Sequence, residues 1–202
     1  MIRRTDAEGI RVLTIDRPDK ANSLTADMLA ALIDGVSEPE GLRMLILTGA
    51  GAKVFSAGAD LAEAKTGLAT SPLWEALSAK IAAAPCLTVA ALNGTLAGGA
   101  FGMALACDLR LSVPHATFFY PVARLGFLPQ PSDPTRLSAL IGPARTKLVL
   151  AAGARLDAAE ALAFGLVDRV VPDPLAAAQN LAAELNATDP AHLAAIKAMV
   201  PG

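Results

Sequence analysis

Two glycine-containing segments of the chain place small residues where a backbone can approach a ligand. The first is Phe55-Ser56-Ala57-Gly58-Ala59-Asp60-Leu61, and the second runs from Asn93 through Gly98 and Gly99 to Gly102. A helix that begins at Gly99 would point free N–H groups and the positive end of its dipole at such a ligand. Two N–H groups that converge on one carbonyl oxygen form an oxyanion hole, in which one donor is worth about 3 kcal/mol. Tight turns and close packing are the alternative explanation of either segment alone.

Both segments follow predicted strands. Apolar and β-branched runs predict strands over residues 10–15, 44–48, 87–92 and 109–113, and a further strand at 116–120. Helical spacing and helix-start residues predict helices from residue 26, over 72–83 and over 98–106. Strands separated by helices favour crossover connections and a mostly parallel sheet, so the predicted fold class is α/β. Ligands of such sheets bind beyond the carboxyl ends of the strands, where both glycine segments fall.

The rest of the chain is helical and rich in alanine. Gly142 and Asp157 open two helices, of which the second ends at Gly165, and two more are predicted over 174–186 and 189–199. The segment Pro172-Asp173-Pro174 is the best candidate for a hinge. We therefore predict a core over residues 1–172 and a shorter helical C-terminal segment over 173–202.

Composition excludes several classes of function. Of 202 residues 53% are hydrophobic and 18% charged, which rules out a disordered chain. Lys and Arg number 17 against 19 Asp and Glu, a net charge of −2 that gives no electrostatic basis for binding nucleic acid or an acidic membrane. Two cysteines and two histidines, without a CxxC pair, make a disulfide scaffold or a zinc site improbable. Neither an uninterrupted apolar span nor an N-terminal secretory signal is seen, so we expect a cytoplasmic protein.

Several further segments stand in a characteristic order along nearly the whole chain. They are Ile15-Asp16-Arg17-Pro18-Asp19-Lys20-Ala21-Asn22-Ser23-Leu24, the Ser56–Asp60 loop, Ala91-Leu92-Asn93-Gly94, Gly98-Gly99, Cys107-Asp108, Leu125-Gly126, Arg136-Leu137 and Phe164-Gly165-Leu166-Val167-Asp168-Arg169-Val170-Val171-Pro172. Together these segments resemble the crotonase family, also called the enoyl-CoA hydratase/isomerase family.

The resemblance implies a spiral of repeated ββα units that binds a coenzyme A thioester. It implies no prosthetic group, coenzyme A being part of the substrate, and a homo-oligomer, commonly a trimer or a dimer of trimers. Carried over position by position, the oxyanion hole falls on the backbone N–H groups of Ala59 and Gly99. The positions implied to contact coenzyme A or substrate are Lys20, Ala21, Ser56, Ala57, Ala59, Leu61 and Gly99. Lys20 suits a phosphate as a point charge, or it is a solvated loop lysine.

The chain departs from the family pattern at its acidic positions. Hydratases of the family carry two glutamates that hold and activate water, and their positions are Gly102 and Val122 here. Family isomerases use an acid a few residues further on, and Gln130 occupies that position. None of these three side chains transfers a proton, so we expect weak ordinary hydration. Family members also commonly continue with further helices beyond 189–199, which implies a pocket covered by another subunit or a more open one.

Asp133 is the nearest remaining carboxylate in sequence. Ser132-Asp133-Pro134 has the form of a helix start, so an N-cap role for Asp133 competes with a catalytic one. Tyr120 and His115 are more typical of structural residues, and Asp60 is expected to hold its loop by hydrogen bonds to backbone.

Three functions remain open from the sequence. The first is an enzyme that stabilises the enolate or oxyanion of an acyl-CoA and uses non-standard acid–base residues, as isomerisation, decarboxylation or thioester cleavage would allow. The second is an acyl-CoA-binding or accessory subunit that has lost the chemistry. The third is a weak hydratase with a displaced acid.

Overall fold

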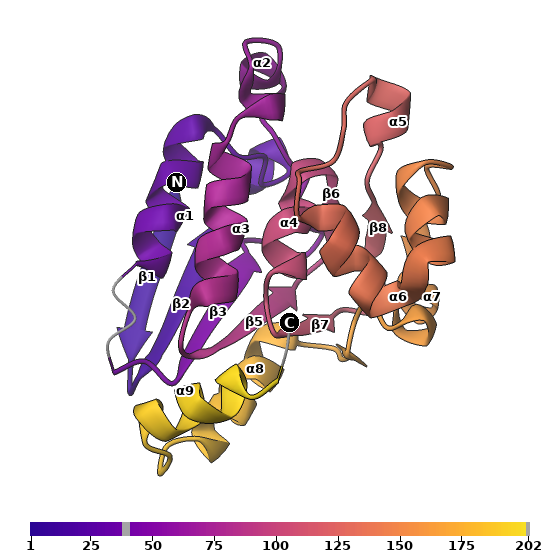
Figure 1. Cartoon of the computed structure of the whole chain (residues 1–202). Coiled ribbons are helices and arrows are strands. Elements are labelled where there is room, and N and C mark those ends of the chain that lie inside the picture. The colour runs from indigo at the N-terminus through magenta and orange to yellow at the C-terminus, as the bar shows by residue number, and fades with distance from the viewer. Residues whose placement is uncertain (38–40, 201–202) are drawn as a thin grey trace.

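The computed structural model describes residues 1–37 and 41–200 and consists of two sheets surrounded by helices (Figure 1). In the described part of the chain the larger sheet has six strands in the order β1-β2-β3-β5-β7-β10. Their bounds are β1 Ile2–Ala7, β2 Ile10–Ile15, β3 Met44–Gly49, β5 Leu87–Leu92, β7 Leu109–Ser112 and β10 Arg169–Val170. Neighbouring strands are parallel except for β1 and β2. The predicted mostly parallel sheet is confirmed.

The smaller sheet has the order β4-β6-β8-β9 among the described residues. Its strands are β4 Val54–Ser56, β6 Thr95–Ala97, β8 Thr117–Phe119 and β9 Leu156–Asp157. The pairs β4–β6 and β6–β8 are parallel, and β8–β9 is antiparallel. The sequence predicted β8 from the five-residue apolar and aromatic run 116–120 but did not predict β4, β6 or β9, which lie in no run of that length.

The helices cover the sheets in the succession expected of a spiral. Their bounds are α1 Ala26–Val36, α2 Leu61–Ala64, α3 Leu73–Ala83, α4 Phe101–Leu105, α5 Val122–Leu125, α6 Asp133–Leu150, α7 Ala158–Phe164, α8 Pro174–Glu184 and α9 Pro190–Ala198, with short 3₁₀ helices at Pro18–Lys20, Leu68–Thr70 and Gly98–Ala100. The successions β3-β4-α3, β5-β6-α4 and β7-β8-α6 each give one strand to the larger sheet, one to the smaller sheet and then a helix. This arrangement confirms the predicted spiral of ββα units. No helix in the described ranges has both the length and the hydropathy needed to cross a bilayer.

The larger sheet is buried on both faces. Leu45 and Leu47 belong to the core that includes α1 and α3, whereas Met44 and Ile46 belong to a second core with Ala178 and Ala182 of α8. Side chains of a strand alternate between the two faces of the sheet. A strand that contributes to a core on each face therefore has an uninterrupted apolar sequence. The helical C-terminal segment therefore packs on the sheet through α8, while the domain boundary at residue 172 stays a prediction.

Two carboxylate groups join distant strands. Asp108 Oδ2 accepts hydrogen bonds from the backbone and hydroxyl of Thr88 and pairs with Lys197 of α9 at 2.7 Å. Asp168 Oδ2 accepts from the backbone N–H of Arg110 at 2.7 Å, which places β10 beside β7. Both carboxylates belong to the segments that carried the family resemblance, and here they hold the fold.

Helix α6 corrects one expectation. The helix begins after Ser132, and the side chain of Asp133 accepts no capping hydrogen bond, so the N-cap interpretation of Asp133 is wrong. Gly142, with φ 80° and ψ 161°, interrupts α6, and the helix predicted to open there is its second half. The N-cap of α1 at Thr25 and the end of α7 at Gly165 agree with the prediction.

Candidate active site

The two glycine segments touch because they follow neighbouring parallel strands, β4 and β6. Gly58 has φ +90°, and a Cβ atom built on it would lie 3.1 Å from the backbone N of Gly99 and 3.1 Å from the carbonyl O of Ala97. Only glycine adopts that conformation at such an approach without strain. Gly58, the residue before Ala59, thus lies against the backbone of Gly98 and Gly99.

The N–H groups of Ala59 and Gly99 are both available. Neither donates a hydrogen bond to any acceptor in the described part of the chain, and both residues are partly exposed. Gly99 lies in the first turn of the 3₁₀ helix that leads into α4, where N–H groups have no partner within the helix. On either side of Ala59, Gly58 O accepts from Leu24 N and Asp60 N donates to Leu24 O, each at 2.8 Å. This arrangement is what an oxyanion hole at these two amides requires, although the hole itself stays a prediction.

Asp60 fixes the first loop. Its Oδ1 accepts from the N–H groups of Ala62 and Glu63 at 3.0 and 3.4 Å, which caps α2. Its Oδ2 accepts from Arg17 Nη1 at 2.7 Å, and this bond lowers the pKa of Asp60. The expectation that Asp60 holds its loop through backbone hydrogen bonds is confirmed.

The segments implied to contact coenzyme A lie side by side. Ala57 N donates to Ala21 O at 3.1 Å, and Ser56 Oγ donates to Asn22 O at 2.8 Å. Ser56 is fully buried and also accepts from Gly58 N, so its hydroxyl is used within the protein. Lys20, Ala57 and Leu61 are exposed.

Helix α3 packs one face against the second glycine segment. A Cβ atom on Gly99 would lie 3.2 Å from the ring of Trp74, and one on Gly102 would lie 2.8 Å from Ser78 Oγ. Trp74 and Ser78 are four residues apart, so they share a helix face. The indole N–H of Trp74 donates to Leu68 O at 2.8 Å, which fixes the ring.

The carboxyl group of Asp133 lies beside Gly102. A Cβ atom on Gly102 would be 2.9 Å from Asp133 Oδ1 and 3.4 Å from Oδ2. Asp133 is fully buried, and its Oδ1 has no hydrogen-bond partner among the described residues. Leaving a buried acceptor unpaired costs about 1–3 kcal/mol, so such an atom is a candidate for function.

Tyr120 holds the other oxygen of this carboxyl group. Its Oη donates to Asp133 Oδ2 at 2.9 Å and accepts from Gln130 N at 3.4 Å. The ring stacks on Phe101 of α4 with centroids 5.3 Å apart. The interpretation of Tyr120 as a purely structural residue missed this contact, because the thirteen residues between Tyr120 and Asp133 hide it in the sequence.

Burial sets the protonation of this pair. Burial raises the pKa of Asp133 to about 6; the Tyr120 hydrogen bond opposes the shift, and the negative charge of Glu75 adds to it. Burial and the neighbouring Asp133 carboxylate raise the pKa of Tyr120, so the phenol keeps its proton. Asp133 therefore exchanges a proton near neutral pH, as a general acid or base must.

Glu75 of α3 anchors the start of α6. Its Oε2 accepts from the backbone N of Ser132 at 3.2 Å and from Ser132 Oγ at 3.0 Å. Arg136 Nη1 donates to the same hydroxyl at 2.6 Å. Sequence reasoning gave no signal for Glu75, Trp74 or Ser78, because they act through packing between helices.

The remaining candidate positions offer no proton-transfer group. Val122 and Gln130 are both buried, with an aliphatic and an amide side chain. His115 is exposed, and its Nε2 lies 2.8 Å from Ala52 O. Within the described ranges no three His, Cys, Asp or Glu side chains gather as metal ligands would.

Comparisons with known proteins agree on one family. The family model described as enoyl-CoA hydratase/isomerase matches residues 5–201. A carnitinyl-CoA dehydratase of Citrobacter koseri is 38% identical over 195 residues, which cover 92% of this chain and 74% of that protein. The solved enoyl-CoA hydratase of Bacillus anthracis has a TM-score of 0.88 and 30% identity, covering 97% of this chain and 80% of that one. The solved structure of Pseudomonas aeruginosa DspI has a TM-score of 0.88 and 30% identity, covering 97% of this chain and 84% of that one.

Proposed function

Because this chain belongs to the enoyl-CoA hydratase/isomerase family, we propose that it is an enzyme that moves a proton on an acyl-CoA thioester. The N–H groups of Ala59 and Gly99 hold the thioester oxygen, and Asp133 is the acid–base group. The observation that carries the proposal is the buried, unpaired Oδ1 of Asp133, which lies where a side chain on residue 102 would begin. In the family pattern that position belongs to a glutamate.

The separation between the hole and the acid supports this assignment. Gly99 and Gly102 are three residues apart along a helical segment, which is about one turn, or roughly 5 Å. An acyl group whose carbonyl oxygen is held at Gly99 N and which runs along this turn brings the carbon next to the carbonyl near Gly102 and Asp133. Since Asp133 is fully buried, the acyl group must displace side chains to reach it.

Tyr120 determines which oxygen reacts. Its hydrogen bond occupies Oδ2, so the exchangeable proton resides on Oδ1. As a carboxylate, Oδ1 removes a proton from the carbon next to the thioester carbonyl of a 3-enoyl-CoA. The C–H electron pair moves into the conjugated system, and the negative charge on the oxygen is stabilised by the two N–H groups. The protonated Oδ1 then returns the proton to the far carbon of the former double bond, which gives the 2-enoyl-CoA.

One carboxyl group favours isomerisation over hydration. Isomerisation takes a proton away and returns it, and a single group can do both. Hydration in this family uses two glutamates, and here Gly102 and Val122 supply neither. General acid–base groups typically contribute 10²–10⁴-fold each, so hydration by Asp133 alone is slow.

The coenzyme A moiety is proposed to lie along the joined segments 20–21 and 56–61. Lys20 is exposed and makes no ion pair with a described residue, so it is free to meet a phosphate. A cavity of about 250 Å³ adjoins this surface, lined by Pro18, Asn22, Ala50, Gly51, Ala52, Lys53 and Val54. No prosthetic group enters the proposed reaction.

On the family resemblance, the chain is proposed to form a homo-oligomer, a trimer or a hexamer. Exposed Leu125, Phe127 and Leu128 beside α5 provide apolar surface suited to a subunit contact. Light scattering coupled to size-exclusion chromatography measures the number of subunits. A monomer at micromolar concentration would contradict the proposed oligomer.

The proposal is tested by calorimetry with coenzyme A, crotonyl-CoA and a 3-enoyl-CoA, together with assays of isomerisation and hydration. We expect binding of the thioesters and faster isomerisation than hydration. The variant Asp133→Asn should bind the thioesters but turn over about 10²–10⁴-fold more slowly, whereas Asp27→Asn, an exposed aspartate on α1, should behave as the wild type. Binding without any turnover in the wild type indicates the accessory subunit instead, and the absence of thioester binding overturns the proposal.

A further inference from the structure

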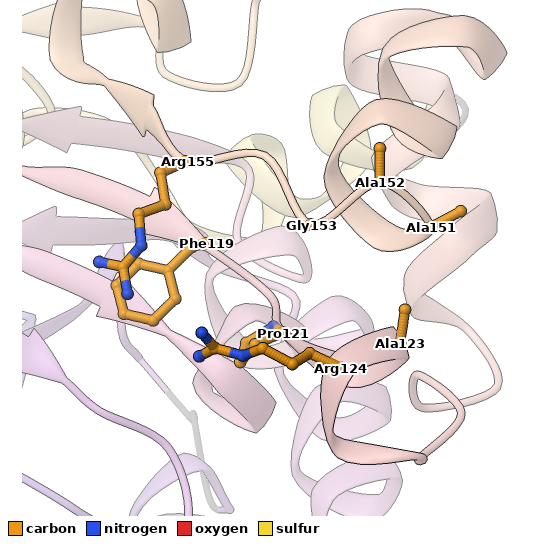
Figure 2. Close-up of a pocket in the computed structure, with 8 residues that line it drawn as sticks. All are labelled: Phe119, Pro121, Ala123, Arg124, Ala151, Ala152, Gly153 and Arg155. Carbon is orange, nitrogen blue, oxygen red and sulfur yellow. The ribbon is translucent and has the colours of Figure 1, made fainter.

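A second cavity lies beside the segment that joins β8 to α5 and contains Tyr120. Its volume is about 300 Å³, and it is formed by β8, α5, the turn between them and the loop that follows α6 (Figure 2). The lining residues are Phe119, Pro121, Ala123, Arg124, Ala151, Ala152, Gly153 and Arg155. None of them belongs to the proposed oxyanion hole or to the acid–base group.

The cavity carries two uncompensated positive charges. Arg124 and Arg155 both line it, no aspartate or glutamate does, and neither guanidinium forms an ion pair with any residue in the described ranges. By contrast, Arg17 and Arg110 pair with Asp60 and Asp168. Because the chain as a whole has net charge −2, two arginines without partners at one cavity are a local excess of positive charge that attracts an anion.

Arg155 is already positioned for such a ligand. Its Cζ atom lies 3.8 Å from the centre of the Phe119 ring, a cation–π contact that fixes the plane of the guanidinium and leaves its edge free to donate. The backbone N–H of Gly153, at φ +71°, also has no acceptor among the described residues. It is available as a further donor.

The opposite wall is apolar. Figure 2 shows the arginine side chains, Phe119 and Pro121 on one side of the cavity and the methyl groups of Ala123, Ala151 and Ala152 on the other. A ligand that satisfies both walls has a charged end and a hydrocarbon body. Ligand sites commonly combine an apolar lining with a few convergent polar groups in this way.

We propose that this cavity binds a small organic carboxylate, held by Arg124 and Arg155 through its oxygens and by the alanine wall through its hydrocarbon part. Guanidinium groups bind carboxylates through paired, charge-assisted hydrogen bonds. The two arginines should therefore bind a carboxylate more tightly than a neutral ligand of the same shape. The site is separate from the thioester site and does not depend on the function proposed for it.

The test uses calorimetry with benzoate, with benzamide as a neutral ligand of the same shape, and with inorganic phosphate. We expect saturable binding of benzoate that is unaffected by coenzyme A, and at least tenfold weaker binding of benzamide and of phosphate. Arg124→Gln and Arg155→Gln should each weaken benzoate binding at least tenfold. Arg145→Gln is the matched control, because Arg145 also stacks on a phenylalanine, at 4.4 Å from Phe164, but does not line the cavity.

Amide chemical shifts give a second readout. Benzoate should move the NMR signals of Ala152 and Gly153 in the wild type and not in Arg155→Gln. Three results overturn the proposal: equal binding of benzoate and benzamide, competition between benzoate and coenzyme A, or loss of benzoate binding in Arg145→Gln to the same extent as in the cavity variants.

Discussion

Asp133 lies against Gly102, with its Oδ1 only 2.9 Å from the point where a Cβ atom on residue 102 would stand. The two residues are 31 positions apart in the sequence, yet a side chain on residue 102 and the carboxyl of residue 133 would compete for the same space. In the proposed mechanism the carboxyl group comes from α6 instead of α4, but it occupies the same place in the site. The missing glutamate therefore does not by itself imply a lost activity.

Asp133→Asn should lower kcat/KM by about 10²–10⁴-fold for isomerisation, the usual contribution of one acid–base group. In the wild type kcat/KM should fall as the pH drops through about 6, where the raised pKa of Asp133 protonates the base. The inflection should be absent in the variant. A pH profile from 4.5 to 8.5 at low substrate concentration tests this, and an unchanged inflection in Asp133→Asn would assign the titration to another group.

Tyr120→Phe should shift that inflection upward. The Tyr120 hydroxyl donates to Asp133 Oδ2 and so favours the ionised carboxyl; its removal raises the pKa of Asp133 further. The phenylalanine keeps the ring that stacks on Phe101. If Tyr120 had a purely structural role, Tyr120→Phe would lower the stability and leave the pH of the kcat/KM inflection unchanged. The pH profile therefore separates the two roles.

Stability should depend on pH through the same carboxyl. The pKa of Asp133 rises from 3.8 to about 6 on folding, so the folded state binds more protons between these values. The free energy of unfolding should therefore decrease as the pH rises from about 4 through about 6, by roughly 2–3 kcal/mol in total. Urea unfolding of wild type and Asp133→Asn at pH 4, 5.5 and 7.5 measures the difference. Parallel curves for the two proteins would contradict the shift.

Gly102→Glu should destabilise the fold by about 1–3 kcal/mol, because its first side-chain atom collides with Ser78 Oγ and the Asp133 carboxyl. Combining it with Asp133→Gly should recover much of that loss, since one of the two competing groups is removed. The two single variants and the double variant form a cycle whose coupling energy reports the shared space. Additive effects would show that the two positions do not compete.

Gly99→Pro and Gly99→Ala separate the amide donor from the crowding of the loop. Both add a Cβ atom about 3.2 Å from the Trp74 ring, but only proline removes the N–H. We expect Gly99→Ala to retain part of the turnover and Gly99→Pro to lose at least a further 10²-fold, the cost of one oxyanion donor. Trp74 is the single tryptophan, so its fluorescence monitors whether the loop stays folded. Equal activities in two folded variants would remove Gly99 from the hole.

Sequence patterns determined the parallel strands, the long helices and the order of the two glycine loops. Strands such as 44–48 and helices such as 26–36 carry their signal in local spacing, because burial on fixed faces imposes a period on the residues. The fold family followed from the resemblance of several ordered motifs along the chain to those of the crotonase family. The sequence did not predict the short strands β4 and β6, which bring the two glycine segments together, because neither lies in an apolar run as long as the one that contains β8.

Tertiary structure alone decided the surroundings of Asp133. Its sequence context, a serine before and a proline after, is typical of a helix start, and a local pattern cannot report what a side chain meets 31 residues away. Packing of α6 against α4 turned that side chain inward, where burial, Tyr120 and Glu75 set its pKa. Desolvation and the field of neighbouring charges depend on distance in space, so no reading of sequence order could have supplied them.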